Sequence, residues 1–254
     1  MKNTKYGSNQ HNKFPLNGVT EDVDFYTEIK SVFLVLSGPG GTGKTSLIKR
    51  WLNDCPDLGY VPNVTTRAPR QNSVVDESGF YTHVSRSKFR EMVNKNMFAQ
   101  WVNPSRGKYY GTPLLPLEKA VSEGRDLVFD YTPQLYINLR RQFRQQVVGI
   151  FIIPPTLSEL TDRLLKRGTE KGEELYIKQM MAMQDLAYVD EHDYHIVNDD
   201  FDQTLKKLKC IHTSERCRMS RTIGLSERCR EISPHSMMFY YDPLNQRLAH
   251  MEDD

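Results

Sequence analysis

The chain has 254 residues, a formal net charge of +2 and four cysteines. This length fits one α/β domain with tails better than two full domains, and the mixed charges give no broad basic surface for nucleic acid. No apolar run approaches the roughly 20 residues of a membrane span, and scattered cysteines without a signal peptide favour reduced thiols. We therefore expect a soluble, cytoplasmic protein that binds neither nucleic acid nor a membrane.

Residues 1–30 come before the first long apolar run, and we expect them to form a flexible leader. The opening stretch is polar and rich in Asn and Lys. It has neither the apolar centre of a secretory signal nor the Arg- and Ser-rich composition of a transit peptide. The folded domain is therefore expected to begin at residue 31.

An apolar run over residues 32–36 leads into a glycine-rich octet, residues 38–45, which fits the phosphate-binding pattern G-x-x-x-x-G-K-[ST]. Glycines let the backbone aim its N–H groups inward, and a following helix offers its positive end to an anion. Lys44 is expected to reach the outer phosphates of a nucleotide, and Thr45 to bind Mg²⁺ through its hydroxyl. The expected phosphate-contacting residues are Gly38, Gly40, Gly41, Thr42, Gly43, Lys44, Thr45 and Ser46.

A second anion site is predicted further along the chain. Arg67 and Arg70 are three residues apart, and Pro69 stiffens the turn between them. Tyr81 and the run over residues 109–112 add hydroxyl groups. Arginine is the preferred residue for a bidentate grip on phosphate. On spacing alone, however, a solvated pair of surface arginines explains this segment equally well.

Strands and helices alternate through the rest of the chain. Two buried strands are predicted, one at residues 127–129, directly followed by Asp130, and one at residues 147–153. A third strand is predicted at residues 195–197. Helices are expected to begin at residue 156 and to cover about 173–188 and about 201–208. Such alternation favours a parallel sheet with helices on both faces and ligands at the carboxyl ends of the strands. The phosphate loop and Asp130 would both lie at that edge.

Arg163 and Arg167 are four residues apart on an expected helix, just before Gly168. Phosphoryl transfer depends mainly on positioning and on neutralising charge, for which mobile arginines near a hinge are suited. An exposed basic helix end, favoured by the helix dipole, explains this segment equally well when it is taken alone.

The last part of the chain, residues 210–254, is expected to be an extension beyond a domain at residues 31–209. The sequence Ser-Glu-Arg-Cys-Arg occurs there twice, beginning at Ser214 and at Ser226. Paired C-x-x-C spacing is absent, so we favour an amphipathic or partly disordered extension over a metal site. Nothing in this segment indicates the oligomeric state.

The order of these segments resembles the guanylate kinase family. The matching pieces are the phosphate loop, V-T-T-R-A-P-R, F-Y-T-H-V, F-A-Q-W-V, K-Y-Y-G-T, the strand ending in Asp130, I-I-P-P, R-L-L-K-R-G-T and H-I-V-N-D-D. They span about residues 32–208. The resemblance implies a P-loop NTPase-type α/β fold with a nucleoside-monophosphate-binding lobe at about 64–113 and a lid at about 167–174. It also implies transfer of the γ-phosphoryl group of MgATP to GMP or dGMP.

The resemblance also implies roles for individual residues. Arg163 and Arg167 would neutralise the phosphate in transfer together with Lys44, Asp130 would stand near the metal ion and the acceptor's phosphate, and Asn198 would lie near the adenine of ATP. The residues that would hold the acceptor's phosphate are Arg67, Arg70, Tyr81 and Tyr110.

Departures from the family pattern fall mainly in the part that would bind the base. Asn63 stands where the family usually has serine, Gln100 where it has glutamate, and Thr132 where it has the second carboxylate of D-x-D. Guanine presents N–H donors that carboxylates suit best, so losing two charge-assisted bonds at about 1.5–3 kcal/mol each would weaken guanine binding. These three residues form the expected base site, and the amides of Asn63 and Gln100 could instead bind the edge of another base. Thr112 is expected among the residues that bind the acceptor nucleotide.

The sequence therefore predicts an ATP- and Mg²⁺-dependent nucleoside monophosphate kinase. Its acceptor would be GMP, dGMP or, because of the altered base site, another (deoxy)nucleoside monophosphate. A catalytically weak binding module resembling guanylate kinases is the competing hypothesis, although such modules typically lose the phosphate loop that this chain keeps. A kinase acting on a different small phosphate ester is a third hypothesis.

Overall fold

The computed structural model describes residues 28–69, 79–105, 107–167 and 173–232. Residues 28–223 form one compact unit, and residues from 224 on belong to a second, of which the structure describes helix α9 (Leu225–Ile232). None of the helices in the described ranges combines the length and the apolar character needed to cross a bilayer. Most of the expected leader lies outside these ranges.

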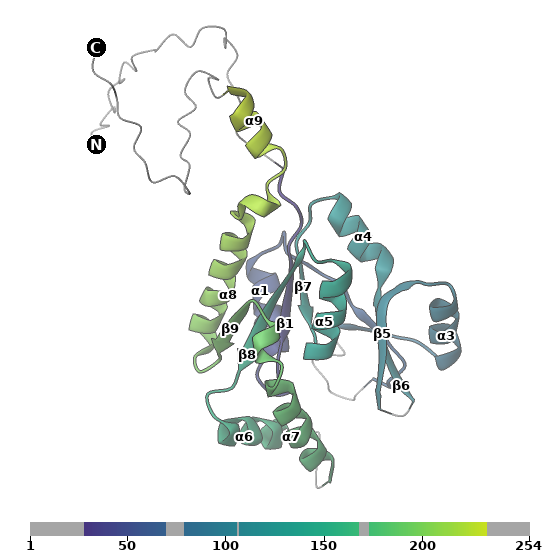
Figure 1. Cartoon of the computed structure of the whole chain (residues 1–254). Helices are drawn as coiled ribbons and strands as arrows, with labels where there is room; N and C mark the ends of the chain where they lie inside the picture. The colour runs from purple at the N-terminus through teal and green to yellow at the C-terminus, as the bar shows by residue number, and fades with distance from the viewer. Residues whose placement is uncertain (1–27, 70–78, 106, 168–172, 233–254) are drawn as a thin grey trace, which may run out of the picture. The chain divides into compact units, whose positions relative to one another are not determined.

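A five-stranded parallel sheet with the order β2-β7-β1-β8-β9 forms the centre of the unit at residues 28–223 (Figure 1). Its strands are β1 (Phe33–Ser37), β2 (Gly59–Tyr60), β7 (Leu127–Asp130), β8 (Val147–Ile153) and β9 (Tyr194–Val197). Every residue of β1 is buried, as expected for a central parallel strand covered on both faces. The predicted parallel sheet is therefore confirmed.

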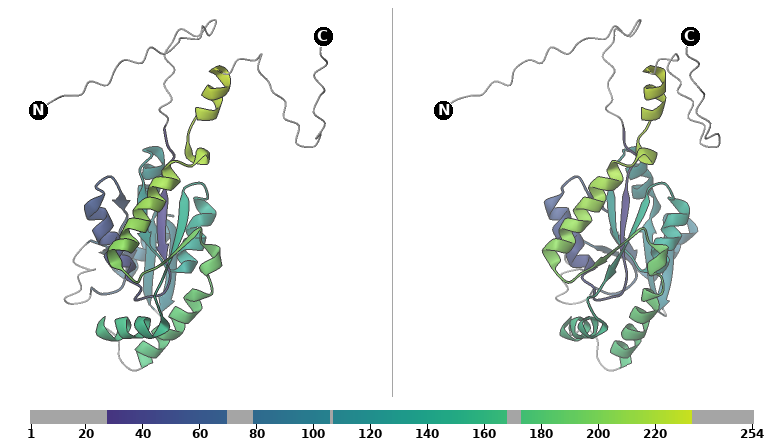
Figure 2. Two further views of the ribbon diagram at one scale, coloured as in Figure 1. Left: turned by 90° about the vertical axis from the view of Figure 1, so that its left-hand side faces the viewer. Right: turned by 60° about the vertical axis from the view of Figure 1, so that its left-hand side comes forward.

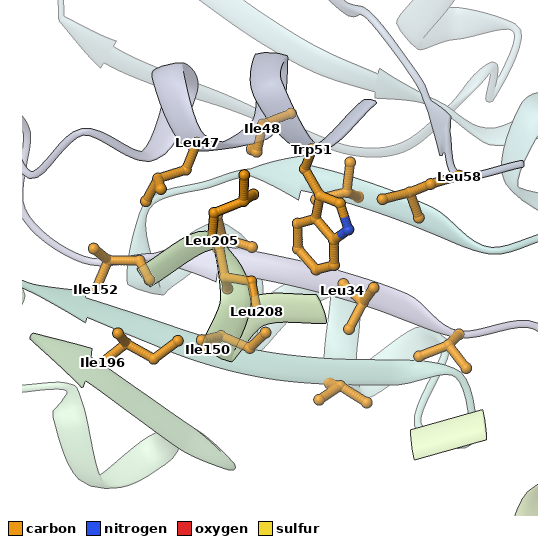
Figure 3. Close-up of a cluster of buried hydrophobic side chains, with 14 of the residues drawn as sticks. Leu34, Leu47, Ile48, Trp51, Leu58, Ile150, Ile152, Ile196, Leu205 and Leu208 are labelled. Atoms are coloured by element: carbon orange, nitrogen blue, oxygen red, sulfur yellow. The ribbon is translucent and has the colours of Figure 1, made fainter. Parts of the chain in front are cut away.

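Helices α1 (Lys44–Asp54) and α8 (Phe201–Arg216) cover one face of this sheet. Figure 3 shows their apolar side chains meeting over the strands. The residues of this cluster that the figure labels are Leu34, Leu47, Ile48, Trp51, Leu58, Ile150, Ile152, Ile196, Leu205 and Leu208. Burying one such side chain contributes about 1.5–3 kcal/mol, so this cluster fixes α1, and with it the loop that precedes α1, on the sheet.

Helices α4 (Leu114–Ser122) and α5 (Pro133–Gln142) cover the opposite face. Leu117 of α4 and Leu139 of α5 are fully buried against aromatic side chains of the central strands. Tyr136 of α5 lies over Gly149 of β8, where a Cβ atom would collide with the phenol ring. The sheet thus has a helical layer on both faces, as the alternation of elements predicted.

A second, four-stranded sheet with the order β4-β3-β6-β5 occupies the region in which the small lobe was expected. Its strands are β3 (Asn63–Thr65), β4 (Tyr81–His83), β5 (Phe98–Ser105) and β6 (Lys108–Pro113), and α3 (Arg86–Asn94) accompanies them. Ser85 caps α3 by accepting a hydrogen bond from the Lys88 N–H. Arg70 and the residues up to 78 lie outside the described residues.

Helices α6 (Leu157–Arg167) and α7 (Glu173–Leu186) lie by the carboxyl ends of β1 and β8, and the C-terminal end of α8 lies at the other edge of the sheet (Figures 1 and 2). Of the expected lid, residues 168–172 fall outside the described part of the chain. Short turns of 3-10 helix, η1 (Val189–Glu191) and η2 (Met219–Arg221), follow α7 and α8.

Helix α8 continues to Arg216, whereas the sequence predicted an end near Leu208. Besides the packing of Ile211 against the core cluster, a buried carboxylate holds its last turns. Asp126 accepts hydrogen bonds from the backbone N–H of Val32 at 2.8 Å, from Nε2 of His212 at 2.6 Å and from Arg216 at 2.7 Å. The expected domain boundary at residue 209 therefore falls inside a helix, and the first Ser-Glu-Arg-Cys-Arg copy belongs largely to that helix.

Candidate active site

The phosphate loop joins β1 to α1. At several of its positions the backbone has a conformation that favours glycine. Gly38, Gly41 and Gly43 have φ angles of 121°, 92° and 93°, in the region that other residues avoid. Nδ2 of Asn198 donates a hydrogen bond to the Thr42 carbonyl at 2.7 Å. A Cβ atom at Gly43 would lie 2.7 Å from that same nitrogen. Asn198 was expected near the adenine of ATP. In the structure its side chain binds the backbone of the phosphate loop.

Lys44 is buried at the first position of α1, and its ammonium group is turned into the loop. Nζ donates hydrogen bonds of 2.9 Å to the carbonyl oxygens of Gly38 and Pro39. Phosphate oxygens can replace these carbonyls without a large movement of the side chain. Asp185 of α7 is an acidic residue near this ammonium that sequence reasoning missed. Burial raises the pKa of Asp185 to about 6, although the positive charge of Lys44 acts to lower it.

Thr45 and Asp130 come together at the carboxyl edge of the sheet. The Thr45 hydroxyl donates a short hydrogen bond to Oδ2 of Asp130. The contact forms because β7 pairs in parallel with β1, placing Asp130 beside Leu36 just before the loop. A hydroxyl and a carboxylate side by side suit Mg²⁺, which takes few protein oxygens and completes its shell with water and phosphate oxygens. These two residues therefore fit the expected metal.

Arg163 on α6 faces the phosphate loop region. Its guanidinium donates to Oε1 of Glu159 at 3.1 and 2.5 Å and to the carbonyl oxygen of Asn198 at 3.0 Å. A Cβ atom added at Gly41 would lie 3.2 Å from Leu160 and 3.0 Å from Leu164 of the same helix, so α6 packs directly on the loop. The side chain of Arg167 lies outside the described residues.

Three of the residues expected to hold the acceptor's phosphate lie together on the second sheet. The guanidinium carbon of Arg67 is 5.3 Å from the ring centre of Tyr81, and the rings of Tyr81 and Tyr110 are 6.1 Å apart. They converge because β3 pairs with β4 on one side and with β6 on the other. Arg70 is not among the described residues.

The expected base site contains a chain of neutral hydrogen bonds. The Thr112 hydroxyl donates to Oδ1 of Asn63 at 2.9 Å and lies 2.6 Å from the Tyr131 hydroxyl. A hydroxyl has one hydrogen, so Tyr131 donates to Thr112. Burial raises the pKa of Tyr131 above its usual value, which keeps this donor protonated. The sequence did not assign Tyr131 to the site, whereas Thr132, which it did assign, is exposed at the start of α5.

Gln100 on β5 is the unsatisfied member of the site. Its side chain is buried, with an exposure of 7%, and neither Oε1 nor Nε2 has a hydrogen-bond partner among the described residues. A buried amide left in this way costs about 1–3 kcal/mol for each unmade bond, which a polar ligand can recover. The Gln100 amide lies beside the Tyr131 hydroxyl and presents an acceptor and a donor at the position that carries glutamate in the family pattern.

Comparison with known proteins identifies the family. The family model of guanylate kinase matches residues 30–215. The chain is 36% identical over 190 residues to guanylate kinase of Desulfitobacterium hafniense, covering 75% of this chain and 93% of that protein. It is 38% identical over 198 residues to guanylate kinase of Maricaulis maris, covering 78% and 89%.

A solved structure shows the same relationship. The crystal structure of guanylate kinase from Anaplasma phagocytophilum matches with a TM-score of 0.67 and 25% identity, over 81% of this chain and 96% of that chain. Together with the phosphate loop and the residues gathered around it, these matches confirm the resemblance found in the sequence. The chain belongs to the guanylate kinase family, whose members are ATP-dependent nucleoside monophosphate kinases.

Proposed function

We propose that the chain transfers the γ-phosphoryl group of MgATP to GMP or dGMP and that it selects the base less strictly than its relatives do. The observation that carries the proposal is the hydrogen bond between Thr45 and Asp130, beside the buried Lys44. It brings the hydroxyl of the phosphate loop and a carboxylate of the next strand to one point. A binding module without catalysis would have no need of this arrangement.

In this proposal Lys44 and the loop N–H groups hold the phosphates of ATP, and Thr45 with Asp130 holds Mg²⁺. The bound ion would neutralise charge on the phosphates in transfer. Arg163, already oriented by Glu159 and the Asn198 carbonyl, would swing its guanidinium toward the transferred group. We assign the same task to Arg167. Catalysis then consists of alignment and charge neutralisation, with no covalent enzyme intermediate.

Arg67, Tyr81 and Tyr110 would bind the acceptor's phosphate, with Arg70 as a further contact. Their grouping on the second sheet supports this role, because a guanidinium beside two phenol groups offers charge and several donors to a phosphate. The acceptor would then lie between this sheet and the phosphate loop. In that position its phosphate faces the γ-phosphate of ATP.

The proposed base choice follows from the amide of Gln100. Guanine offers the O6 acceptor beside the N1–H donor, whereas adenine offers the N6 donor beside the N1 acceptor. An amide carries one acceptor and one donor and can present them in either order after a half-turn. A glutamate in this place would accept only. The unpartnered Gln100 amide therefore suits both purines, and the neutral Asn63 and Thr112 add no charge that would select guanine.

ADP release from MgATP tests both parts of the proposal. We expect turnover with GMP and dGMP, weaker but measurable turnover with AMP, and little with CMP, UMP or dTMP. Lys44→Ala should abolish turnover with every acceptor. Turnover confined to GMP and dGMP would overturn the relaxed base choice and leave the kinase assignment intact. No turnover with any acceptor, while ATP still binds, would overturn the kinase assignment in favour of a binding module.

A further inference from the structure

A cavity of about 520 Å³ lies at the amino ends of the central strands, at the opposite edge of the sheet from the phosphate loop. Cavities of about 300–1,000 Å³ commonly hold small molecules. The cationic side chains that line it are Lys30, Arg140, Arg144, Arg218 and Arg221, and the anionic ones are Asp193 and Glu215. Five positive and two negative groups leave a formal charge of +3, and we call this space the basic cavity.

Both carboxylates of the basic cavity are committed to ion pairs that hold the fold. Glu215 pairs with Arg221 at 3.0 Å, and Arg221 also donates to the Gln145 carbonyl at 2.6 Å. Although burial opposes it, hydrogen bonds from Tyr194 and Arg221 hold the pKa of Glu215 below its usual value. Asp193 pairs with Arg140 at 3.0 Å. These ion pairs account for the positions of Arg221 and Arg140 without a bound ligand.

Of the remaining three cations, Arg218 forms an ion pair with Oε1 of Glu215 at 2.7 Å, whereas Lys30 and Arg144 form none with the residues that the structure describes. Among the residues that the structure describes, Nζ of Lys30 reaches only neutral oxygens, Oε1 of Gln145 at 3.4 Å and the Ser220 carbonyl at 3.5 Å. Arg218 bonds through Nη2 alone among the described residues, so Nε and Nη1 stay available. Arg144 makes no hydrogen bond or ion pair with any residue that the structure describes. Three cationic groups with unused donors thus face one hollow.

We propose that the basic cavity binds the phosphate group of a small molecule, at a site separate from the nucleotide sites. Like charges held close together repel, and a dianion bound among them removes that cost. Arginine forks grip phosphate in a bidentate manner, and the ammonium of Lys30 adds a further donor. Because this site and the phosphate loop are at opposite edges of the sheet, occupancy of one does not block the other.

Inorganic phosphate is the probe that tests the site. Equilibrium dialysis of the full chain against labelled phosphate is carried out at constant ionic strength, with MgADP present to occupy the phosphate loop. We compare the wild type with Lys30→Gln/Arg144→Gln and with the control Arg141→Gln. Arg141 is exposed at the end of α5 and does not line the cavity, so its substitution removes a charge and leaves the site intact.

We expect the double variant to lose one bound phosphate per chain, or to bind it at least tenfold more weakly, while Arg141→Gln binds as the wild type does. Equal binding by all three proteins, or equal loss in the control, would overturn the site. Competition by glycerol 3-phosphate then separates two sources of the same group. Displacement of the label indicates a phosphate ester as the natural occupant, and failure to displace it indicates free phosphate.

Discussion

The Thr45 hydroxyl donates a hydrogen bond to Asp130, and this contact ties the first turn of α1 to the tip of β7. The two residues are far apart in the sequence and meet only because β1 and β7 are neighbours in the sheet. A phosphate loop is common to many kinds of nucleotide-binding protein. In this protein the hydroxyl of the loop also lies beside a carboxylate from the neighbouring strand, and together the two groups suit a metal ion at the carboxyl edge of the sheet.

Asp130→Asn should raise the Mg²⁺ concentration needed for half-maximal turnover at least tenfold, because an amide oxygen carries no charge for the ion. Thr45→Ser keeps the hydroxyl and should change this concentration little. The measurement is the initial rate of ADP release as a function of Mg²⁺ at fixed ATP. An unchanged Mg²⁺ dependence in Asp130→Asn would remove Asp130 from the metal site.

Gln100→Glu should increase the ratio of kcat/KM for GMP to that for AMP by about tenfold or more. A carboxylate adds a charge-assisted bond to the guanine donors, worth about 1.5–3 kcal/mol, and repels the N1 acceptor of adenine. The matched control is Gln100→Leu, which should lower kcat/KM for both purines. A ratio that does not change in Gln100→Glu would show that this residue does not contact the base.

Gly43→Ala should weaken ATP binding by tenfold or more. The substitution places a Cβ atom at a φ of 93° and within 2.7 Å of the Asn198 amide, so the loop must move. Gly40→Ala is the control, since Gly40 has no positive φ and nothing lies within 4 Å of the added atom. Titration calorimetry with ATP gives the two dissociation constants. Similar losses in both variants would mean that the loop shape does not depend on Asn198.

Asp185 should make stability fall as pH rises toward neutrality. Its pKa is raised from 3.8 to about 6 by burial, so the folded protein favours the protonated form. The stabilisation is complete below pH 3.8 and is lost as the pH rises through about 6. Urea unfolding between pH 4 and pH 8 should show this loss in the wild type, and Asp185→Asn should remove it. Parallel pH profiles of the two proteins would contradict the prediction.

The sequence predicted the parts of this molecule whose signals are local. The phosphate loop follows from one octet, and Asp130 follows from an apolar run that ends in an acid. Strand order then brings Asp130 to Thr45, as the alternation of elements indicated. The hydrogen bonds that join Thr112 to Asn63 and Tyr131 were not predictable, because they connect β3, β6 and the end of β7, and no spacing in the chain encodes that meeting.

Charged residues that are buried also escaped prediction. Glu215, with an exposure of 2%, lies on the inner face of α8, although its neighbours in the sequence read as a solvated tail. Asp185 follows a Met-rich stretch and matches no motif. A pattern of apolar residues indicates a buried helix face, whereas a face buried through ion pairs carries no such pattern. The position at which α8 ends and the burial of Asp185 could therefore be seen only in the structure.

The contact of Asp126 with the last turns of α8 decides where the chain can be shortened. Cutting after residue 209, where the sequence predicted the end of the domain, would remove both His212 and Arg216. Of the three hydrogen bonds described for the buried carboxylate of Asp126, the one from the Val32 N–H would remain. Leaving a buried charge without its partner typically costs about 3–5 kcal/mol, a large share of a domain's whole stability. A shortened protein intended for crystallisation should therefore retain the chain through residue 223, where the compact unit ends.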